Sequence, residues 1–96
     1  MIQSFADDAT ADWYHGQNTH RVRRFSPTLQ RVALRKLDVL AAAFRLDDLR
    51  EAPGNRLEAL KRDLAGYFSI RVNEHWRLVF RWEGNHAYDI VLTDYP

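Results

Sequence analysis

The 96-residue sequence contains no cysteine, which excludes disulfide bonds, thiolate nucleophiles and cysteine-ligated zinc. It also has no apolar run long enough to span a membrane, and Met1 leads directly into a short strand-like segment instead of a signal peptide. We therefore expect a cytoplasmic protein that does not bind membranes. No glycine-rich phosphate loop and no nucleophile elbow is present.

Metal ligands are equally sparse. The four histidines, His15, His20, His75 and His86, are scattered over predicted loops and turns without metal-ligand spacing. The simplest interpretation is that all four are surface residues. We expect neither a metal nor another cofactor. With 46% hydrophobic and 12% aromatic residues, the composition is that of a globular protein. The length predicts a single domain over residues 1–96 with a modest core.

Lysine is rare among the 14 basic residues, of which 12 are arginine. The net charge of +1 does not by itself indicate a nucleic-acid partner, but residues 21–36 contain six basic side chains and no acid. Arginine suits bidentate phosphate contacts and base stacking, although a GC-rich genome would also enrich it. The loop carrying Arg21, Arg23 and Arg24 is therefore a candidate phosphate-binding segment.

Two helices are predicted in the first half of the chain. After a short strand at Met1–Phe5, Asp7 or Asp8 caps a helix that runs to about His15 and ends at Gly16.

Residues 17–25 form a polar, basic loop. Ser26 as N-cap and Pro27 as the first helical residue then start a helix that runs to about Arg45. Its apolar stripe at helical spacing consists of Leu29, Ala33, Leu37, Leu40 and Phe44. Residues 46–49 add a short turn, and residues 52–54 break the chain.

The rest of the chain is organised around residues 56–82, which alternate with a period of two. In residues 67–72 the apolar face consists of Phe68, Ile70 and Val72, and the other of Tyr67, Ser69 and Arg71. In residues 76–82 the apolar face consists of Trp76, Leu78, Phe80 and Trp82, and the other of Arg77, Val79 and Arg81.

The alternation also predicts the register of this hairpin. A three-residue loop over residues 73–75 pairs Val72 with Trp76 and Arg71 with Arg77, whereas a two-residue turn would mix apolar and charged side chains on both faces. Two arginines side by side are unfavourable unless an anion lies between them. They are therefore either two solvated side chains or a phosphate site.

Residues 56–60 begin the sheet, and Gly84-Asn85 turns the chain into a last strand over residues 87–93, with Tyr88, Ile90 and Leu92 facing the core. The predicted fold is α+β, with two helices packed on one face of a small, mostly antiparallel twisted sheet. The predicted core places Phe68, Ile70, Trp76, Leu78 and Phe80 beneath Leu37, Leu40 and Phe44.

The remaining chemistry lies in basic residues, carboxylates and one hydroxyl: Lys61, Arg71, Arg77, Asp94 and Tyr95. Such a set can cleave RNA without a metal. RNA supplies its own nucleophile in the 2′-hydroxyl, so the protein must supply a base, an acid and cations for the pentavalent phosphate. Spacing alone predicts no more than an anion-binding face.

The segments NRLEAL-K, SIRVN and WRLVF resemble the core of the HigB-type toxins of the RelE superfamily. The resemblance covers nearly the whole chain. It implies an endoribonuclease that cuts mRNA in the ribosomal A site and is neutralised by a helix-turn-helix, HigA-like antitoxin. Through that antitoxin the toxin would contact operator DNA only indirectly.

The resemblance extends to the candidate catalytic residues Lys61, Arg71, Arg77, Asp94 and Tyr95. It departs at Arg62, where the family usually has glycine, at Leu64, where arginine is frequent, and at Pro96, where the family usually ends in histidine. That histidine resembles a proton-transfer group, which proline cannot replace.

Lys61, Asp94 or Tyr95 then carries the proton transfer, or activity is weak. For a toxin of this kind, we predict that the loop carrying Arg21, Arg23 and Arg24 helps to hold ribosomal RNA through sequence-independent phosphate contacts. Further candidate RNA contacts are Arg56, Arg62 and Arg81. Two alternatives remain: a catalytically weakened homologue that still binds antitoxin or ribosome, and a DNA-bound co-regulator.

Overall fold

The computed structural model describes residues 1–51 and 54–94. The predicted chain break at Ala52-Pro53, and Tyr95 and Pro96, lie outside the described residues. The elements in chain order are α1 (Asp8–Tyr14), the 3₁₀ turn η1 (Val22–Arg24), α2 (Pro27–Ala42), α3 (Leu46–Glu51), β1 (Glu58–Ala59), the 3₁₀ turn η2 (Arg62–Leu64), β2 (Tyr67–Arg71), β3 (Trp76–Glu83) and β4 (His86–Asp94). None of the helices in the described part is both long and apolar enough to cross a membrane.

Both predicted helix starts are confirmed. Asp7 Oδ1 accepts the backbone N–H of Thr10 at 2.9 Å, and Ser26 Oγ accepts that of Leu29 at 3.1 Å. Each cap satisfies an amide that has no partner within its own helix.

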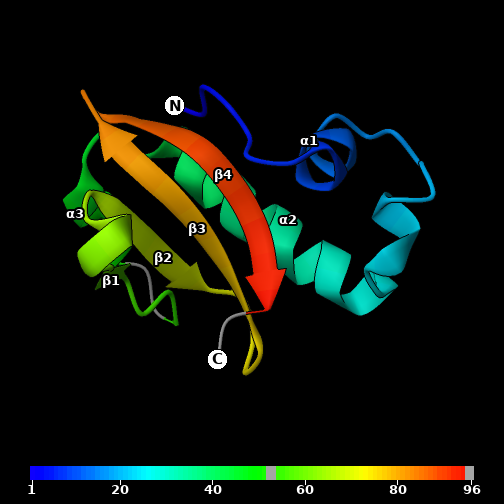
Figure 1. Cartoon of the computed structure of the whole chain (residues 1–96). Coiled ribbons are helices and arrows are strands. Elements are labelled where there is room, and N and C mark those ends of the chain that lie inside the picture. The colour runs from blue at the N-terminus through cyan, green and yellow to red at the C-terminus, as the bar shows by residue number, and fades with distance from the viewer. Residues whose placement is uncertain (52–53, 95–96) are drawn as a thin grey trace.

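The sheet has the order β1-β2-β3-β4, and each neighbouring pair is antiparallel. The N-terminal segment runs beside β4 (Figure 1), where Ile2 and Phe5 form two isolated parallel bridges with Ala87 and Ile90. The predicted strand at Met1–Phe5 is therefore reduced to two bridges. They flank an irregular part of β4 where Ser4 Oγ, instead of a backbone carbonyl, accepts the amide of Asp89 at 2.8 Å.

Helix α2 crosses behind the sheet and covers one of its faces, while no α-helix of the described residues covers the other face (Figure 1). Leu37 and Leu40 of α2 form one core cluster with Ile70, Leu78 and Phe80, all of them fully buried. The predicted α+β class and helix-covered face are confirmed. Phe68 and Trp76 are only partly buried at the edge of this cluster.

The prediction that Phe44 belongs to the core is wrong. Helix α2 ends at Ala42, Ala43 is extended, and the Phe44 residue is 81% exposed. The cause lies four residues on, because Asp48 Oδ2 accepts the amides of Phe44 and Arg45 at 2.9 and 3.0 Å. These bonds cap α3 and turn the chain out of the α2 helix before Phe44.

The predicted inward orientation of Tyr88 is also wrong. The pairing of β3 with β4 shifts at a bulge, where Asp89 adopts a φ of 53°, and this extra residue reverses the alternation. Ala87 and Ile90 therefore both face the core. Tyr88 instead lies opposite Arg81, whose guanidinium carbon is 4.5 Å from the ring centroid.

Candidate functional site

The β2–β3 hairpin places two arginines side by side on the face without helices. Arg71 and Arg77 are direct register partners, as predicted. Asn73 Oδ1 shapes the loop by accepting the amides of His75 at 2.8 Å and Trp76 at 2.9 Å. A short polar side chain that binds amides two and three residues ahead stabilises this kind of turn, so the register is fixed locally.

The Arg77 guanidinium is held in place by neutral acceptors. Its Nε donates to Ser69 Oγ and one Nη2 proton donates to the Arg56 carbonyl, both at 2.8 Å. Ser69 is fully buried, and Arg56 has a φ of 45°, in the left-handed region that non-glycine residues seldom adopt. Among the described residues no group accepts from Nη1, which is left to contact a ligand.

Asn55 fixes the segment that carries the Arg56 carbonyl. The buried side chain of Asn55 donates to the Leu49 carbonyl at 3.0 Å and accepts from Lys36 Nζ at 2.6 Å. Its backbone carbonyl accepts the Arg71 amide at 2.6 Å. One residue thus joins α2, α3 and β2. Burial, with the nearby charge of Arg35, lowers the pKa of Lys36.

The two hairpin arginines differ in charge balance from the third arginine on this face. Within residues 1–51 and 54–94 neither Arg71 nor Arg77 has a carboxylate at ion-pair distance, and Arg71 Nε donates to the Asn73 carbonyl at 3.2 Å. Arg81 is paired with both Asp89 and Glu83. Partial burial acts to lower the pKa of Arg81, but these carboxylates outweigh it and raise that pKa. A free anion is attracted to the first two arginines more than to Arg81.

The other candidate catalytic residues do not all lie on the same face as this pair. Lys61 is exposed at the N-cap of η2, just after β1, and Arg62 within η2 is exposed with a φ of 59°. Asp94 is the register partner of Trp76, not of Arg77, so alternation directs it to the opposite face of the sheet. Tyr95 lies outside the described residues. Within those residues no group of three His, Asp or Glu side chains could hold a metal ion.

Comparison with known proteins identifies the family. The family model of the HigB-like toxins, described as the RelE-like toxin HigB of type II toxin–antitoxin systems, matches residues 3–95. Toxin HigB-1 of Vibrio cholerae serotype O1 is 39% identical over 92 residues, which cover 96% of this chain and 95% of the relative. The chain belongs to the HigB-like toxins.

Three further similarities concern one sequence relative and two solved structures, and the two structures show the fold alone. An uncharacterised protein of Haemophilus influenzae is 34% identical to this HigB-like toxin, and the match covers 94% of the toxin and 87% of the relative. Among solved structures, the toxin shares its fold with the YoeB–YefM complex from Staphylococcus aureus, at a TM-score of 0.63, 22% identity and coverage of 100% and 98% of the two chains. The YoeB/ParE toxin from Agrobacterium tumefaciens gives a TM-score of 0.62 at 17% identity, covering 98% of this chain and 99% of that one.

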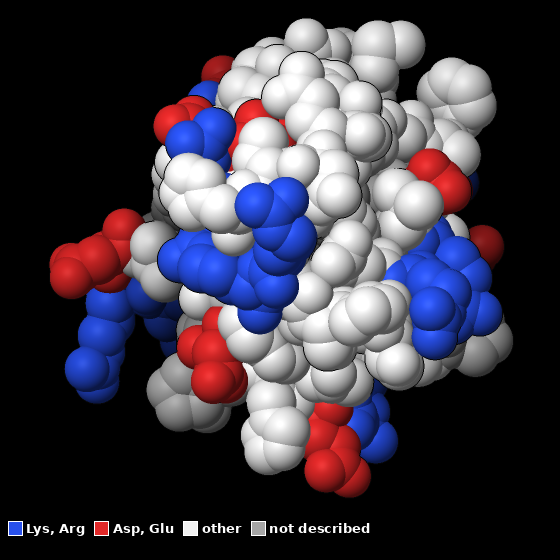
Figure 2. Space-filling model, turned by 90° about the vertical axis from the view of Figure 1, so that its right-hand side faces the viewer, with Lys and Arg blue, Asp and Glu red and all other residues white. Residues whose placement is uncertain are grey.

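The three arginines of the basic loop in this HigB-like toxin are not equally free to bind an anion. Arg21 donates to Asp12 Oδ2 from Nε at 3.0 Å and from Nη2 at 2.7 Å, so its charge is largely compensated. Among the described residues, Arg23 and Arg24 donate only to backbone carbonyls, of Asn18 and Arg21 respectively. On the side shown in Figure 2, the basic side chains form separate groups with uncharged surface between them. The uncompensated positive charge of this loop thus lies mainly on Arg23 and Arg24.

The Asp12–Arg21 pair predicts a pH-dependent contribution to stability. The hydrogen bond from Arg21 outweighs partial burial and lowers the pKa of Asp12. A carboxyl whose pKa is lower in the folded than in the unfolded protein stabilises the fold at pH values above its unfolded-state pKa of about 4. This stabilisation is lost as the pH falls through the folded-state pKa. The difference in urea midpoint between the wild type and Asp12→Asn should shrink from pH 6 to pH 3. A difference that stays constant would contradict this prediction.

Two supporting residues of the hairpin site escaped prediction from the sequence. Asn55 and Ser69 are both buried polar residues whose partners come from distant segments. For Ser69 a weak signal existed, because it alternates onto the same strand face as Arg71. For Asn55 the only signal was its place in a segment that resembles the toxin family.

Proposed function

We propose that this HigB-like toxin is an endoribonuclease that arrests translation by cutting mRNA on the ribosome, with Arg71 and Arg77 binding the scissile phosphate. The observation that carries the proposal is the paired, partly preset guanidinium groups, which lack a carboxylate partner among the described residues. A phosphate is the anion whose geometry matches arginine donors.

The proposed reaction uses the 2′-hydroxyl of the RNA as the nucleophile. Its oxygen attacks the adjacent phosphorus, the bond to the 5′ oxygen of the next nucleotide breaks, and the products are a 2′,3′-cyclic phosphate and a 5′-hydroxyl. A base takes the 2′ proton and an acid returns one to the leaving oxygen. Lys61, Asp94 and Tyr95 are the candidates for these two roles, and the two arginines stabilise the charge of the pentavalent phosphate. Asp94 is the weaker candidate, because alternation directs its side chain to the face opposite the two arginines.

The proposed partners are the ribosome with its mRNA and a helix-turn-helix, HigA-like antitoxin, all in the cytoplasm. The fold shared with YoeB of the Staphylococcus aureus YoeB–YefM complex supports a protein partner. Arg23, Arg24, Arg56 and Arg62 are exposed and are proposed to contact RNA phosphates. A catalytically weakened homologue that binds antitoxin or ribosome without efficient cleavage is the alternative, because Pro96 stands at the position of the family's terminal histidine.

The test is cleavage of a defined mRNA on programmed ribosomes. We expect a cut whose upstream product ends in a 2′,3′-cyclic phosphate, and no cut once a single 2′-deoxynucleotide replaces the one before the mapped site. Equal cleavage of that deoxy-substituted mRNA would exclude the 2′-hydroxyl mechanism. If neither ribosome-bound nor free mRNA is cut, the alternative of a weakened homologue is correct.

Pro96→His is expected to raise the rate of cleavage, because histidine supplies a proton-transfer group where proline has none. The measurement is the single-turnover rate on the same programmed ribosomes, with Pro96→Ala as the control for loss of the proline ring. An equal rate in Pro96→His and Pro96→Ala would show that Lys61, Asp94 or Tyr95 already carries the proton transfer.

A further inference from the structure

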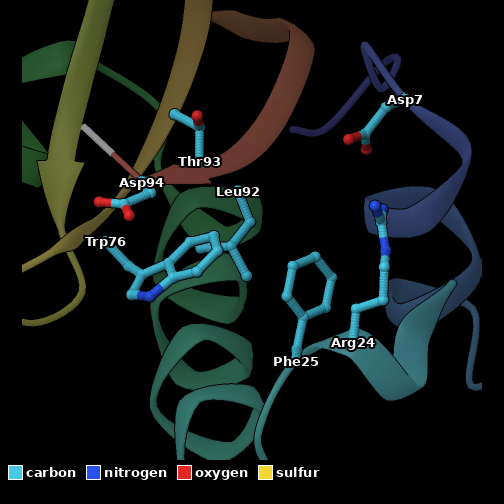
Figure 3. A pocket seen from close by; sticks show the side chains of 7 residues that line it. All are labelled: Asp7, Arg24, Phe25, Trp76, Leu92, Thr93 and Asp94. Atoms are coloured by element: carbon cyan, nitrogen blue, oxygen red, sulfur yellow. The ribbon is translucent and has the colours of Figure 1, made fainter.

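A cavity of about 240 Å³ lies beside the hairpin, between η1 and the ends of β3 and β4. Figure 3 shows Trp76, Leu92 and Phe25 across its floor. Asp7 and Arg24 stand on one wall, and Thr93 and Asp94 on the other. The volume is below the roughly 300–1,000 Å³ typical of pockets for drug-sized ligands, so the cavity suits a single ring system.

The floor offers an aromatic surface. The rings of Phe25 and Trp76 are 5.8 Å apart and meet edge to face at 88°. In such a pair one ring keeps both faces free of its partner, and Trp76 is only partly buried. A flat heteroaromatic ring can therefore stack on this floor, as bases of single-stranded RNA stack on protein aromatics.

The polar wall complements this floor. Asp7 caps α1 through Oδ1, and its Oδ2 accepts no hydrogen bond from the described residues. In Figure 3 the Asp7 carboxylate points toward the cavity, whereas that of Asp94 points away from Arg24. Arg24 has no carboxylate at ion-pair distance in the described part of the chain. The cavity thus combines an aromatic floor, one cation and one available carboxylate.

The cavity also adjoins the proposed cleavage site. Thr93, on its rim, is the register partner of Arg77, and Trp76, on its floor, directly precedes Arg77 in the chain. Because Trp76 and Arg77 are consecutive in β3, their side chains lie on opposite faces of the sheet. A nucleotide next to a phosphate held by Arg77 would therefore reach this cavity around the ends of β3 and β4.

We propose that this cavity binds one nucleobase of the RNA, guanine in preference to the others, with Arg24 contacting the attached phosphate. The inference deepens the proposed function and rests on it. An ionised carboxylate only accepts hydrogen bonds. Guanine presents two neighbouring donors, N1–H and N2–H, to one carboxylate. Adenine and cytosine place an acceptor nitrogen beside their amino group, and uracil flanks its N3–H with two carbonyl oxygens, so all three fit Asp7 less well.

The test measures binding without cleavage. The protein labelled with ¹⁵N is titrated with GMP, AMP, CMP and UMP, and with inorganic phosphate, while the indole N–H signals are followed by NMR. We expect GMP to shift the Trp76 signal at the lowest concentration and to leave those of Trp13 and Trp82 in place. Asp7→Asn keeps a side-chain carbonyl that can cap α1 and should weaken GMP binding about tenfold, the usual scale for a hydrogen bond to a charged group.

Asp8→Asn is the matched control, because Asp8 lies one residue on, is exposed and does not line the cavity. It removes the same charge and should leave GMP binding unchanged. Arg24→Gln should weaken all four nucleotides alike. The inference is overturned if Trp76 does not respond, if inorganic phosphate gives the same response, or if Asp7→Asn and Asp8→Asn behave equally. GMP binding without mRNA cleavage would contradict the proposed function but support the base-binding cavity. Cleavage without a Trp76 response would support the proposed function but contradict the base-binding cavity.

Discussion

Arg77→Ala is expected to lower the rate of mRNA cleavage by about a hundred- to a thousandfold, the usual cost of losing one preorganised donor to a transition-state charge. The preorganisation is visible in the structure, because Ser69 and the Arg56 carbonyl fix two guanidinium nitrogens and leave Nη1 for the phosphate. The measurement is the single-turnover rate on programmed ribosomes, together with loss of growth arrest in cells.

Two further variants separate charge from geometry. Arg77→Lys keeps the charge but cannot hold Ser69, the Arg56 carbonyl and a phosphate together, so it should recover only part of the activity. Arg45→Ala removes an exposed positive charge at the far end of α2 and should cleave at the wild-type rate. Thermal melting and antitoxin binding should be unchanged in all three variants. Full activity in a folded Arg77→Ala protein would rule out the phosphate site.

The register of the arginine pair could be predicted because it depends on neighbouring residues only. Alternation in two strands and a three-residue loop left one arrangement with an apolar face and a charged face, and the structure has it. The helix starts at Asp7 and Ser26 were predictable for the same reason, since a cap and its amide lie three residues apart.

The support of the site could not be predicted, because it depends on contacts between distant parts of the chain. The bond from Lys36 to Asn55 spans 19 residues and that from Arg77 to the Arg56 carbonyl spans 21. No local pattern distinguishes such a buried asparagine from one in an exposed turn. The ion pairing of individual arginines was hidden in the same way. Acids compensate the charges of Arg21 and Arg81, whereas no acid of the described residues pairs with Arg71 or Arg77.

The errors in the predicted core share a physical origin. In both cases the apolar periodicity of the sequence continues past the residue at which the regular backbone geometry ends. The bulge at Asp89 reverses the faces of β4, and Tyr88 moves from the core to the face of Arg81. Phe44 continues the helical spacing of Leu37 and Leu40, but the capping of α3 by Asp48 ends α2 first.

Leu40→Ala and Phe44→Ala therefore form a decisive pair for the core, although the sequence places both residues on one stripe. Leu40 is fully buried, so removing its side chain should lower the free energy of unfolding by roughly 2–5 kcal/mol. Phe44 is 81% exposed, and its truncation should change that free energy by no more than about 0.5 kcal/mol. Urea unfolding followed by tryptophan fluorescence measures both. A loss at Phe44 as large as that at Leu40 would mean that α2 continues past Ala42 and packs Phe44 into the core.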